Sequence, residues 1–96
     1  MKTSRKFRFR LYVAAGAQNS VHALANLMEL CNEHLLGRFE IEVVDVFRQP
    51  KRALADGVLM TPTLLKLEPN PVLRIIGSLS QRQVVVRAIG LESLAA

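Results

Sequence analysis

The sequence predicts a single α/β domain whose elements follow the order βαβαββα. A run of alternating apolar residues near the N-terminus is typical of a strand, and an apolar stretch at helical spacing and a β-branched run follow it. Thr61-Pro62 then opens an apolar segment that returns after Pro69-Asn70-Pro71, a pattern typical of a β-hairpin. The chain is long enough for one core, so residues 1–96 are expected to form one domain with a basic arm at residues 1–6.

Composition argues against several classes of protein. Hydrophobic residues make up 50% of the chain, but no apolar run approaches the ~20 residues that a membrane span requires. The N-terminus shows no apolar signal region, so we expect a cytoplasmic protein without a membrane segment. Cys31 is the only cysteine, which excludes an intrachain disulfide and a metal site built from several cysteines of one chain.

The positive charge is concentrated at the N-terminus. The formal net charge is +5, and five of the thirteen basic residues lie in the first ten positions: Lys2, Arg5, Lys6, Arg8 and Arg10. In the strand expected over residues 7–13, one face carries Phe7, Phe9, Leu11 and Val13, and the other carries Arg8, Arg10 and Tyr12. Because strand alternation explains the aromatic residues, we expect the arginines to face solvent or a protein partner rather than nucleic acid.

A helix and a second strand are expected next, and with the first strand they form a right-handed βαβ unit. Apolar residues recur at helical spacing over residues 20–35, with Asn19 or Ser20 as the N-cap and Gly37 as the stop. The strand over residues 40–47 carries β-branched residues on both faces, which favours a central position in the sheet.

A short helix and the hairpin follow. Pro50 suits the first turn of a helix over residues 51–56, and Gly57 ends it. Pro62 stands at the first residues of a strand, where a missing backbone donor is tolerated. It is also a candidate for a cis peptide bond, which sequence alone does not decide.

The last helix is expected to begin after Gly77. Ser80 and Gln83 fit a capping box, in which the serine oxygen meets one free amide and the glutamine reaches back to another. Residues 77–80 at a helix N-terminus would also suit an anion, but capping alone explains them and is the favoured interpretation.

Local preference and the expected fold disagree in the C-terminal half. Val84, Val85 and Val86 lie where a helix is expected, yet β-branched residues lose χ1 freedom in a helix and suit a strand. Conversely, the hairpin region contains good helix formers: Leu59, Met60, Leu64, Leu65 and Leu67. We therefore expect the half up to about Phe47 to be fixed, and the half from about Pro50 onward to exchange strand for helix between two states. Val85→Ala with Val86→Ala is expected to favour the helical state.

The element order with Thr-Pro at the third strand is thioredoxin-like, and several segments resemble the KaiB family of circadian-clock proteins. These segments are Leu11-Tyr12-Val13-Ala14, Asn19-Ser20-Val21, Val44-Asp45-Val46, Thr61-Pro62-Thr63-Leu64, and Pro71-Val72-Leu73-Arg74-Ile75-Ile76-Gly77 with Leu79-Ser80. The resemblance covers residues 9–91 and extends to the sensor domain of the histidine kinase SasA. The chain departs from the usual KaiB pattern at the proline-free loop 14–20, at Leu73, at Ser78 and in lacking an acidic C-terminal tail. These departures favour a KaiB paralogue, or a KaiB from a bacterium with an incomplete clock, over a core part of a cyanobacterial oscillator.

The resemblance implies a non-enzymatic protein without a cofactor that binds the ring-shaped ATPase KaiC and acts alongside KaiA-like or SasA-like regulators. It also implies a KaiB/thioredoxin-like α/β domain, with a second, ground-state fold of order βαββααβ as the alternative. In that family the thioredoxin-like monomer binds KaiC and the ground state is a tetramer, so a homo-oligomer, dimer or tetramer, is expected. The expected KaiC-binding face contains the first helix, the second strand and their neighbours.

Two groups of candidate residues follow from this resemblance. The candidates for partner binding are Arg8, Arg10, Tyr12, Asn19, Asp45 and Arg74. The candidates for the fold-switching region are Pro62, Pro71, Gly77, Ser78, Val84, Val85 and Val86.

The alternative is a thioredoxin-like redox or glutathione-binding protein that lacks the CxxC motif. Thiol chemistry in this fold needs a low-pKa cysteine at the N-terminus of the first helix, where residues 16–19 read Gly-Ala-Gln-Asn. Cys31 lies on the apolar face of that helix and is interpreted as a core residue. Glutathione would bind at Thr61-Pro62, with Ser20 or Tyr12 as a polar partner.

No other group of residues predicts catalysis. His22 and His34 are twelve positions apart on the expected helix, too far along it to share a metal ion. Asp45 and Asp56 each lack a second nearby carboxylate for paired acid and base chemistry. The sequence therefore predicts an interaction module rather than an enzyme.

Overall fold

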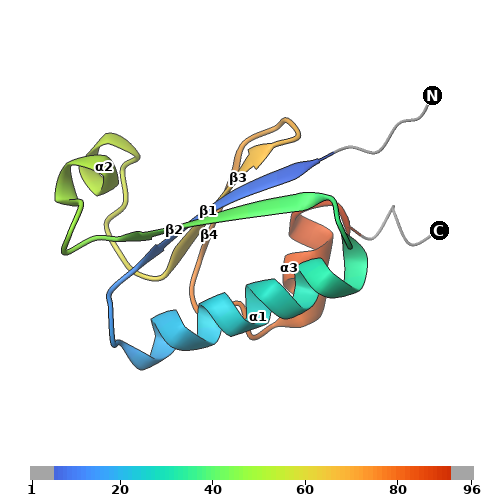
Figure 1. The fold of residues 1–96 in the computed structure, drawn as a ribbon, viewed down its shortest axis with the longest axis horizontal. Helices are drawn as coiled ribbons and strands as arrows, with labels where there is room; N and C mark the ends of the chain where they lie inside the picture. The colour runs from blue at the N-terminus through green and yellow to red at the C-terminus, as the bar shows by residue number, and fades with distance from the viewer. Residues whose placement is uncertain (1–5, 92–96) are drawn as a thin grey trace.

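The chain folds in the order βαβαββα in the computed structural model, which describes residues 6–91 (Figure 1). The elements are β1 Phe7–Val13, α1 Gln18–His34, β2 Phe39–Asp45, α2 Pro50–Ala55, β3 Thr63–Glu68, β4 Leu73–Ile76 and α3 Arg82–Ala88. The predicted α/β class and element order are therefore confirmed. Of the expected basic arm, all but Lys6 lies outside the described residues.

The four strands form one mixed sheet in the order β2-β1-β3-β4. β1 pairs parallel with β2 and antiparallel with β3, and β3 pairs antiparallel with β4. The prediction that residues 40–47 form a central strand is wrong, because β2 lies at an edge and β1 and β3 are central. The β-branched residues of β2 misled the prediction: Val44 is buried, but Val43 on the other face stays exposed.

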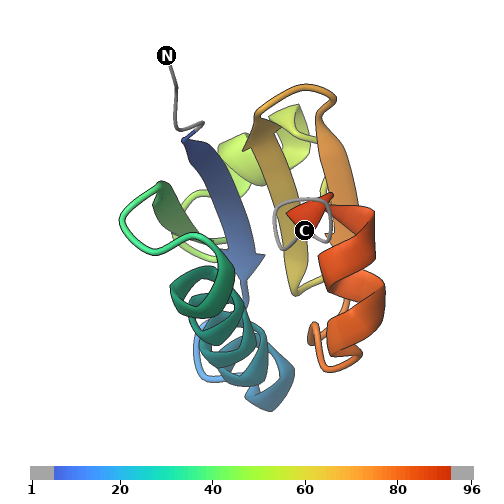
Figure 2. The same cartoon turned by 90° about the vertical axis from the view of Figure 1, so that its right-hand side faces the viewer.

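One face of the sheet carries the main apolar core. The alternating apolar residues of β1 point to this face, where α1 and α3 lie side by side (Figure 2). The buried members of this core are Phe7, Phe9, Leu11, Val13, Ala23, Leu27, Leu30, Cys31, Leu35, Leu64, Leu79, Val85, Val86, Ile89 and Leu91. Cys31 is thus a core residue, as its place on the helix predicts.

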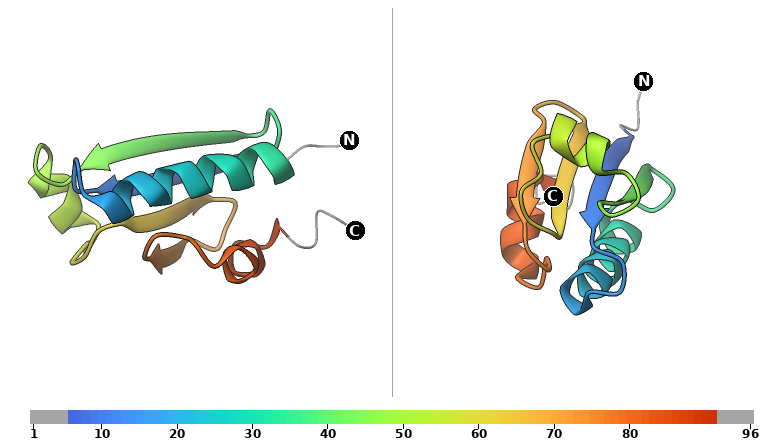
Figure 3. Two further views of the ribbon diagram at one scale, coloured as in Figure 1. Left: turned by 90° about the horizontal axis from the view of Figure 1, so that it is seen from below. Right: turned by 90° about the vertical axis from the view of Figure 1, so that its left-hand side faces the viewer.

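The opposite face is covered by α2 at one end of the strands only (Figure 3). A smaller apolar cluster lies beneath it, made of Tyr12, Val44, Ala53, Val58 and Leu65. The rest of this face carries charged side chains that pair across the strands, including Arg8 with Glu40 and Glu68. The polar face of β1, predicted from its alternation, is therefore only half covered.

Both predicted side-chain caps are wrong. Ala17 is the N-cap of α1, and Ser20 lies inside the helix, where its Oγ accepts a hydrogen bond from the Ala14 N–H at 3.0 Å. Gln81 is the N-cap of α3, and it makes no side-chain capping bond. Because α3 begins one residue later than the capping box requires, Ser80 lies outside the cap position.

The turns follow the sequence more closely. The peptide bond Thr61–Pro62 is cis, as are Glu68–Pro69 and Asn70–Pro71. Gly37, with φ of 75°, adopts the left-handed conformation expected of a residue just beyond a helix. The β3–β4 hairpin forms as predicted, with Leu64 opposite Ile75.

Candidate partner-binding site around α2

The place where this fold would carry a thiol holds no cysteine. α1 begins at Gln18, directly after Ala17, and the only cysteine of the chain lies at position 31 inside the core. Burial raises the pKa of the Cys31 thiol to about 12, so almost none of it is thiolate near neutral pH. Ser20 and Tyr12 are both buried, so neither side chain is exposed to a ligand such as glutathione.

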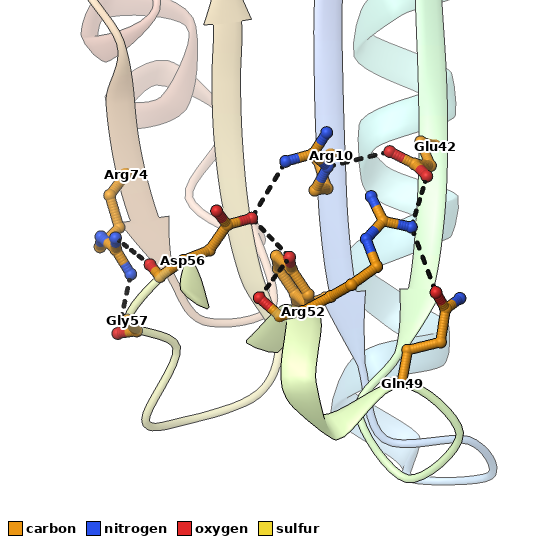
Figure 4. A network of polar contacts seen from close by, with 8 residues as sticks. Arg10, Glu42, Gln49, Arg52, Asp56, Gly57 and Arg74 are labelled. Carbon is orange, nitrogen blue, oxygen red and sulfur yellow. Dashed lines mark hydrogen bonds and ion pairs between the residues drawn. The ribbon is translucent and has the colours of Figure 1, made fainter. Parts of the chain in front are cut away.

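A network of polar contacts instead lies where α2 meets the sheet (Figure 4). Arg10 on β1 stands opposite Glu42 on β2 in the strand register, and its Nε donates to Glu42 Oε1 at 2.9 Å. Arg10 Nη1 also donates to Asp56 Oδ2 at 3.0 Å. Arg10 therefore joins the parallel strand pair to the turn that follows α2.

Tyr12 of β1 joins this network through its hydroxyl group. Its side chain is fully buried, and its single hydroxyl hydrogen is shared between the Arg52 carbonyl oxygen, 3.1 Å away, and the Asp56 carboxylate. Burial, and then the contact with Asp56, raise the pKa of the Tyr12 hydroxyl. The hydroxyl thus stays protonated and acts as a donor.

The two carboxylates of the network are held in the charged form. Hydrogen bonds from Arg52 and then Arg10 lower the pKa of Glu42 to about 2. The hydrogen bond from Tyr12, and then that from Arg10, lower the pKa of Asp56. Arg52 Nη1 reaches Glu42 Oε2 at 2.7 Å and Gln49 Oε1 at 3.3 Å. Glu42 therefore binds groups on β1 and α2, whereas the two groups that donate to the Asp56 carboxylate both lie on β1.

β4 joins the network through Arg74. Its Nη2 donates to the Asp56 carbonyl oxygen at 2.6 Å, and its Nη1 donates to the Gly57 carbonyl oxygen at 3.1 Å (Figure 4). The turn after α2 is therefore bound both to β1, a central strand, and to β4, an edge strand.

Apolar side chains surround this anchored helix on the outside. We call Phe47, Leu54, Leu59 and Met60 the α2 patch; these side chains are between 60% and 91% exposed. Phe47, Leu59 and Met60 line one shallow groove together with Ala53 of α2. Exposed Arg48 and Lys51 lie next to the patch in the sequence. A group of large exposed apolar residues is typical of a protein-binding surface.

The structure separates the predicted partner-binding residues into two sets. Arg10, Tyr12 and Arg74 meet in the network, where they contact the chain itself. Tyr12 has no exposed surface, so in this fold it cannot touch a partner. Arg10 is paired with Glu42 and Asp56 and stays partly exposed to solvent.

The other three candidates lie elsewhere. Arg8 is exposed and paired with Glu40 and Glu68 across the strands. Asn19 is exposed in the first turn of α1. Asp45 Oδ1 accepts a hydrogen bond from the Phe47 N–H at 2.9 Å and so shapes the chain that enters the α2 patch.

Sequence reasoning missed Glu42, Arg52 and Asp56 as site residues. It also missed the patch. One clue was available: Leu59 and Met60, directly before Thr61-Pro62, fit no helical or strand pattern that would bury them, which indicates that they are exposed. The network partners of Arg10 and Tyr12 are 32 to 46 positions away in the chain, so only the fold brings them together.

The fold-switching candidates are spread over the C-terminal half. Pro62 and Pro71 follow cis bonds, and Gly77 has a φ of 122°. The Ser78 carbonyl oxygen accepts a hydrogen bond from Asn26 Nδ2 at 2.8 Å, which ties this loop to α1. Val85 and Val86 are buried in the core, whereas Val84 is exposed.

Metal binding and membrane insertion find no support in residues 6–91. No group of three or more His, Cys, Asp and Glu side chains there is arranged to hold a metal ion. His34 lies 3.2 Å from Glu33, and His22 is exposed. None of the described helices is long and apolar enough to cross a membrane.

The fold and the site define a thioredoxin-fold protein whose exposed surface around α2 suits binding rather than thiol chemistry. Solved structures agree on the fold: chloroplastic thioredoxin z superposes with a TM-score of 0.75 at 19% identity, covering 92% of this chain and 80% of that one. The N-terminal domain of Synechococcus elongatus SasA superposes with a TM-score of 0.73 at 17% identity, covering 91% and 83%.

Sequence similarity identifies the family. The family model described as the KaiB domain matches residues 10–91. A protein of Prochlorococcus marinus strain MIT 9312 named circadian clock oscillator protein KaiB is 43% identical over 94 residues, which cover 98% of this chain and 88% of that protein. A protein of the same name from Synechococcus sp. strain RCC307 is also 43% identical, covering 98% and 84%. The chain belongs to the KaiB family, and this membership supports a regulatory role in the circadian clock.

Proposed function

We propose that this chain is a non-enzymatic regulatory protein that binds a KaiC-like ATPase through the α2 patch. The observation that carries the proposal is the group of four large apolar side chains exposed around a helix that the polar network holds against the sheet. Membership of the KaiB family supplies the class of partner. We place this activity in the cytoplasm.

The charges beside the patch define the partner surface that would fit it. Arg48 and Lys51 are exposed at the start of α2, while most other cations of this face are paired with carboxylates. An apolar partner surface with an acidic rim would complement this arrangement, and the rim would speed association at low salt. KaiA-like or SasA-like regulators would compete with this chain for the ATPase, or bind after the complex has formed.

The expected KaiC-binding face, around α1 and β2, is a less favourable alternative. Val21 and Met28 on α1, Leu36 just after it and Val43 on β2 are also exposed, but around α2 the exposed Phe47, Leu59 and Met60 line one groove together. We further propose that the chain has a second, tetrameric ground state, in which the half up to about Phe47 keeps its structure and the half from about Pro50 refolds.

Binding to the KaiC homologue encoded in the same genome, with and without ATP, tests the function. Leu59→Ser removes the most exposed side chain of the patch and is expected to weaken binding at least about tenfold. Val21→Ser, on the exposed surface of α1, is the matched control and should leave binding unchanged. Absence of binding by the unaltered chain in every nucleotide state would defeat the proposal, and loss with the Val21 variant alone would move the site to α1.

A further inference from the structure

α2 depends on polar contacts for its position. The helix has six residues, too few to be stable alone, and Ala53 is its only buried residue. Leu54, the one large apolar side chain of α2, is exposed in the α2 patch. Burial of apolar surface therefore contributes little to the orientation of this helix on the sheet.

The contacts that fix α2 converge on Asp56. Its carboxylate accepts hydrogen bonds from Arg10 and Tyr12, both on β1, and its carbonyl oxygen accepts one from Arg74 on β4. Asp56 N–H also donates to the Arg52 carbonyl oxygen at 3.0 Å and so closes the end of the helix. One residue thus joins the helix end to a central strand and to an edge strand.

The second anchor of α2 is weaker. Arg52 pairs with Glu42 at 2.7 Å, but these side chains are 36% and 47% exposed, so water and salt screen the pair. Arg10 and Asp56 are 23% and 28% exposed, and their contact is better shielded. Asp56 is therefore the stronger of the two points that hold the helix.

The position of Asp56 in the chain extends its effect to the patch. Leu59 and Met60 lie between Asp56 and the strand that begins at Thr63. The Val58 N–H donates to the Ala53 carbonyl oxygen at 2.8 Å, so the segment leaves α2 in a fixed direction. If the end of α2 moved, Leu59 and Met60 would move with it.

We propose that Asp56 is a positioning residue that holds α2 and the α2 patch in one orientation for the partner. This inference rests on the proposed function, since it names how that surface is kept ready to bind. Loss of the Asp56 carboxylate releases α2 and residues 58–60, while the sheet and the core beneath α1 stay folded.

Amide hydrogen exchange on the full chain tests the inference without a partner. Asp56→Asn keeps the shape of the side chain but removes its charge. The amides of Ala53, Gly57 and Val58, which donate within this region, should exchange about 10- to 100-fold faster, because a hydrogen bond to a charged group is lost. Amides in the middle of α1 should keep their rates. Glu68→Gln removes another carboxylate that pairs with a β1 arginine and is the matched control, expected to leave α2 unchanged.

Two further measurements sharpen the test. Tyr12→Phe removes the hydrogen bonds to Asp56 and to the Arg52 carbonyl oxygen and should accelerate exchange in α2 by itself. Its added effect should be smaller in Asp56→Asn, because there the bond from Tyr12 no longer goes to a charged group. Asp56→Asn should also weaken binding to the KaiC homologue, and the Glu68 control should not. Unchanged exchange in α2, or an equal increase in α1 and α2, would overturn the positioning role, as would unchanged partner binding. If the unaltered chain binds no ATPase, the proposed function fails, and the exchange rates still decide whether Asp56 fixes α2.

Discussion

The two faces of the sheet are held by different forces. Beneath α1 and α3, fifteen buried apolar or thiol-bearing residues form one core. Beneath α2, five residues form a small cluster, and a network of charged and hydrogen-bonded groups completes the attachment. Apolar burial is non-directional and does not depend on protonation, whereas the network depends on geometry, pH and salt.

This difference assigns separate tasks to the faces. The α1 face provides most of the stability, since burial of apolar surface is the dominant favourable term in folding. The α2 face keeps few apolar contacts of its own, so Phe47, Leu54, Leu59 and Met60 remain available on the outside. A surface attached by polar contacts can be repositioned at a smaller free-energy cost than one embedded in the core.

The largest effect is expected from a cavity on the α1 face. Leu27 is fully buried in the core, and Leu27→Ala should lower the free energy of unfolding by about 2–5 kcal/mol. Urea denaturation followed by circular dichroism measures it. Met28→Ala, at a partly exposed position on the same helix, should cost less than about 1 kcal/mol. Equal losses from the two variants would contradict the claim that apolar burial beneath α1 provides most of the stability.

The rate at which a thiol reagent labels Cys31 measures how well the core beneath α1 is shielded from solvent. A rise in pKa from 9.0 to about 12 lowers the thiolate fraction about 1,000-fold near neutral pH, and burial adds a physical barrier. A thiol reagent at pH 8 should therefore label the native chain at least about 1,000-fold more slowly than the urea-unfolded chain. The rate should be the same for Asp56→Asn, because opening of α2 leaves Cys31 covered. Rapid labelling of the native chain would contradict the buried position.

The fold could be predicted from the sequence wherever one element carries its own signal. The alternation of Phe7, Phe9 and Leu11 with two arginines defined β1, and Thr61-Pro62 with its following hairpin was correctly placed. The sequence did not predict correctly those properties of an element that depend on its neighbours, such as the position of β2 in the sheet. β2 carries valines on both faces, and only the strand order shows that one of them, Val43, remains at an exposed edge.

The site could be predicted only in part, for the same reason. Arg10, Tyr12 and Arg74 were identified as candidates, but their hydrogen bonds within the chain depend on strand register and on the return of the chain at Asp56. Asp56 itself looks like an ordinary polar residue at a helix end, and nothing local in the sequence distinguishes it. Long-range pairing of charges is invisible without the topology.

Acid should lower the free energy of unfolding through the α2 face, by less than Leu27→Ala does. The pKa of Glu42 is lowered from 4.5 to about 2, so the folded state keeps its charge where the unfolded chain binds a proton. The stability from this group is present above about pH 4.5 and is lost as the pH falls toward 2. Because Glu42 is half exposed, we expect a loss of no more than about 1 kcal/mol.

Urea unfolding between pH 6 and pH 2 measures this effect. Glu42→Gln should show a flatter decline of stability than the unaltered chain, and ~1 M salt should reduce the difference. The loss caused by Leu27→Ala should stay constant over the same pH range, since it involves no titrating group. A decline that is equally steep with and without Glu42 would rule out its contribution.

The smallest expected effect bears on whether the C-terminal half has two states. Val85→Ala with Val86→Ala, which the sequence suggests as the means to favour the helix, would also remove side chains from the core, because both residues are buried in α3. Val84 is 57% exposed in the same helix, so its replacement changes helix preference with little loss of packing. Val84→Ala should stabilise the helical, thioredoxin-like state by about 0.5 kcal/mol, since alanine has no β-branch to restrict in a helix.

Amide NMR of the C-terminal half at equilibrium decides the point. If a second state is populated, two sets of resonances from about Pro50 onward should be present, and Val84→Ala should reduce the ground-state set about twofold, as about 0.5 kcal/mol requires. Val86→Ala is the opposite control, because lost core methyl groups should outweigh the gain in helix preference and enlarge that set. Resonances up to about Phe47 should stay single in every variant. One set throughout, insensitive to Val84→Ala and to added KaiC homologue, would mean that this sequence has a single fold and that its valine run is accommodated by core packing alone.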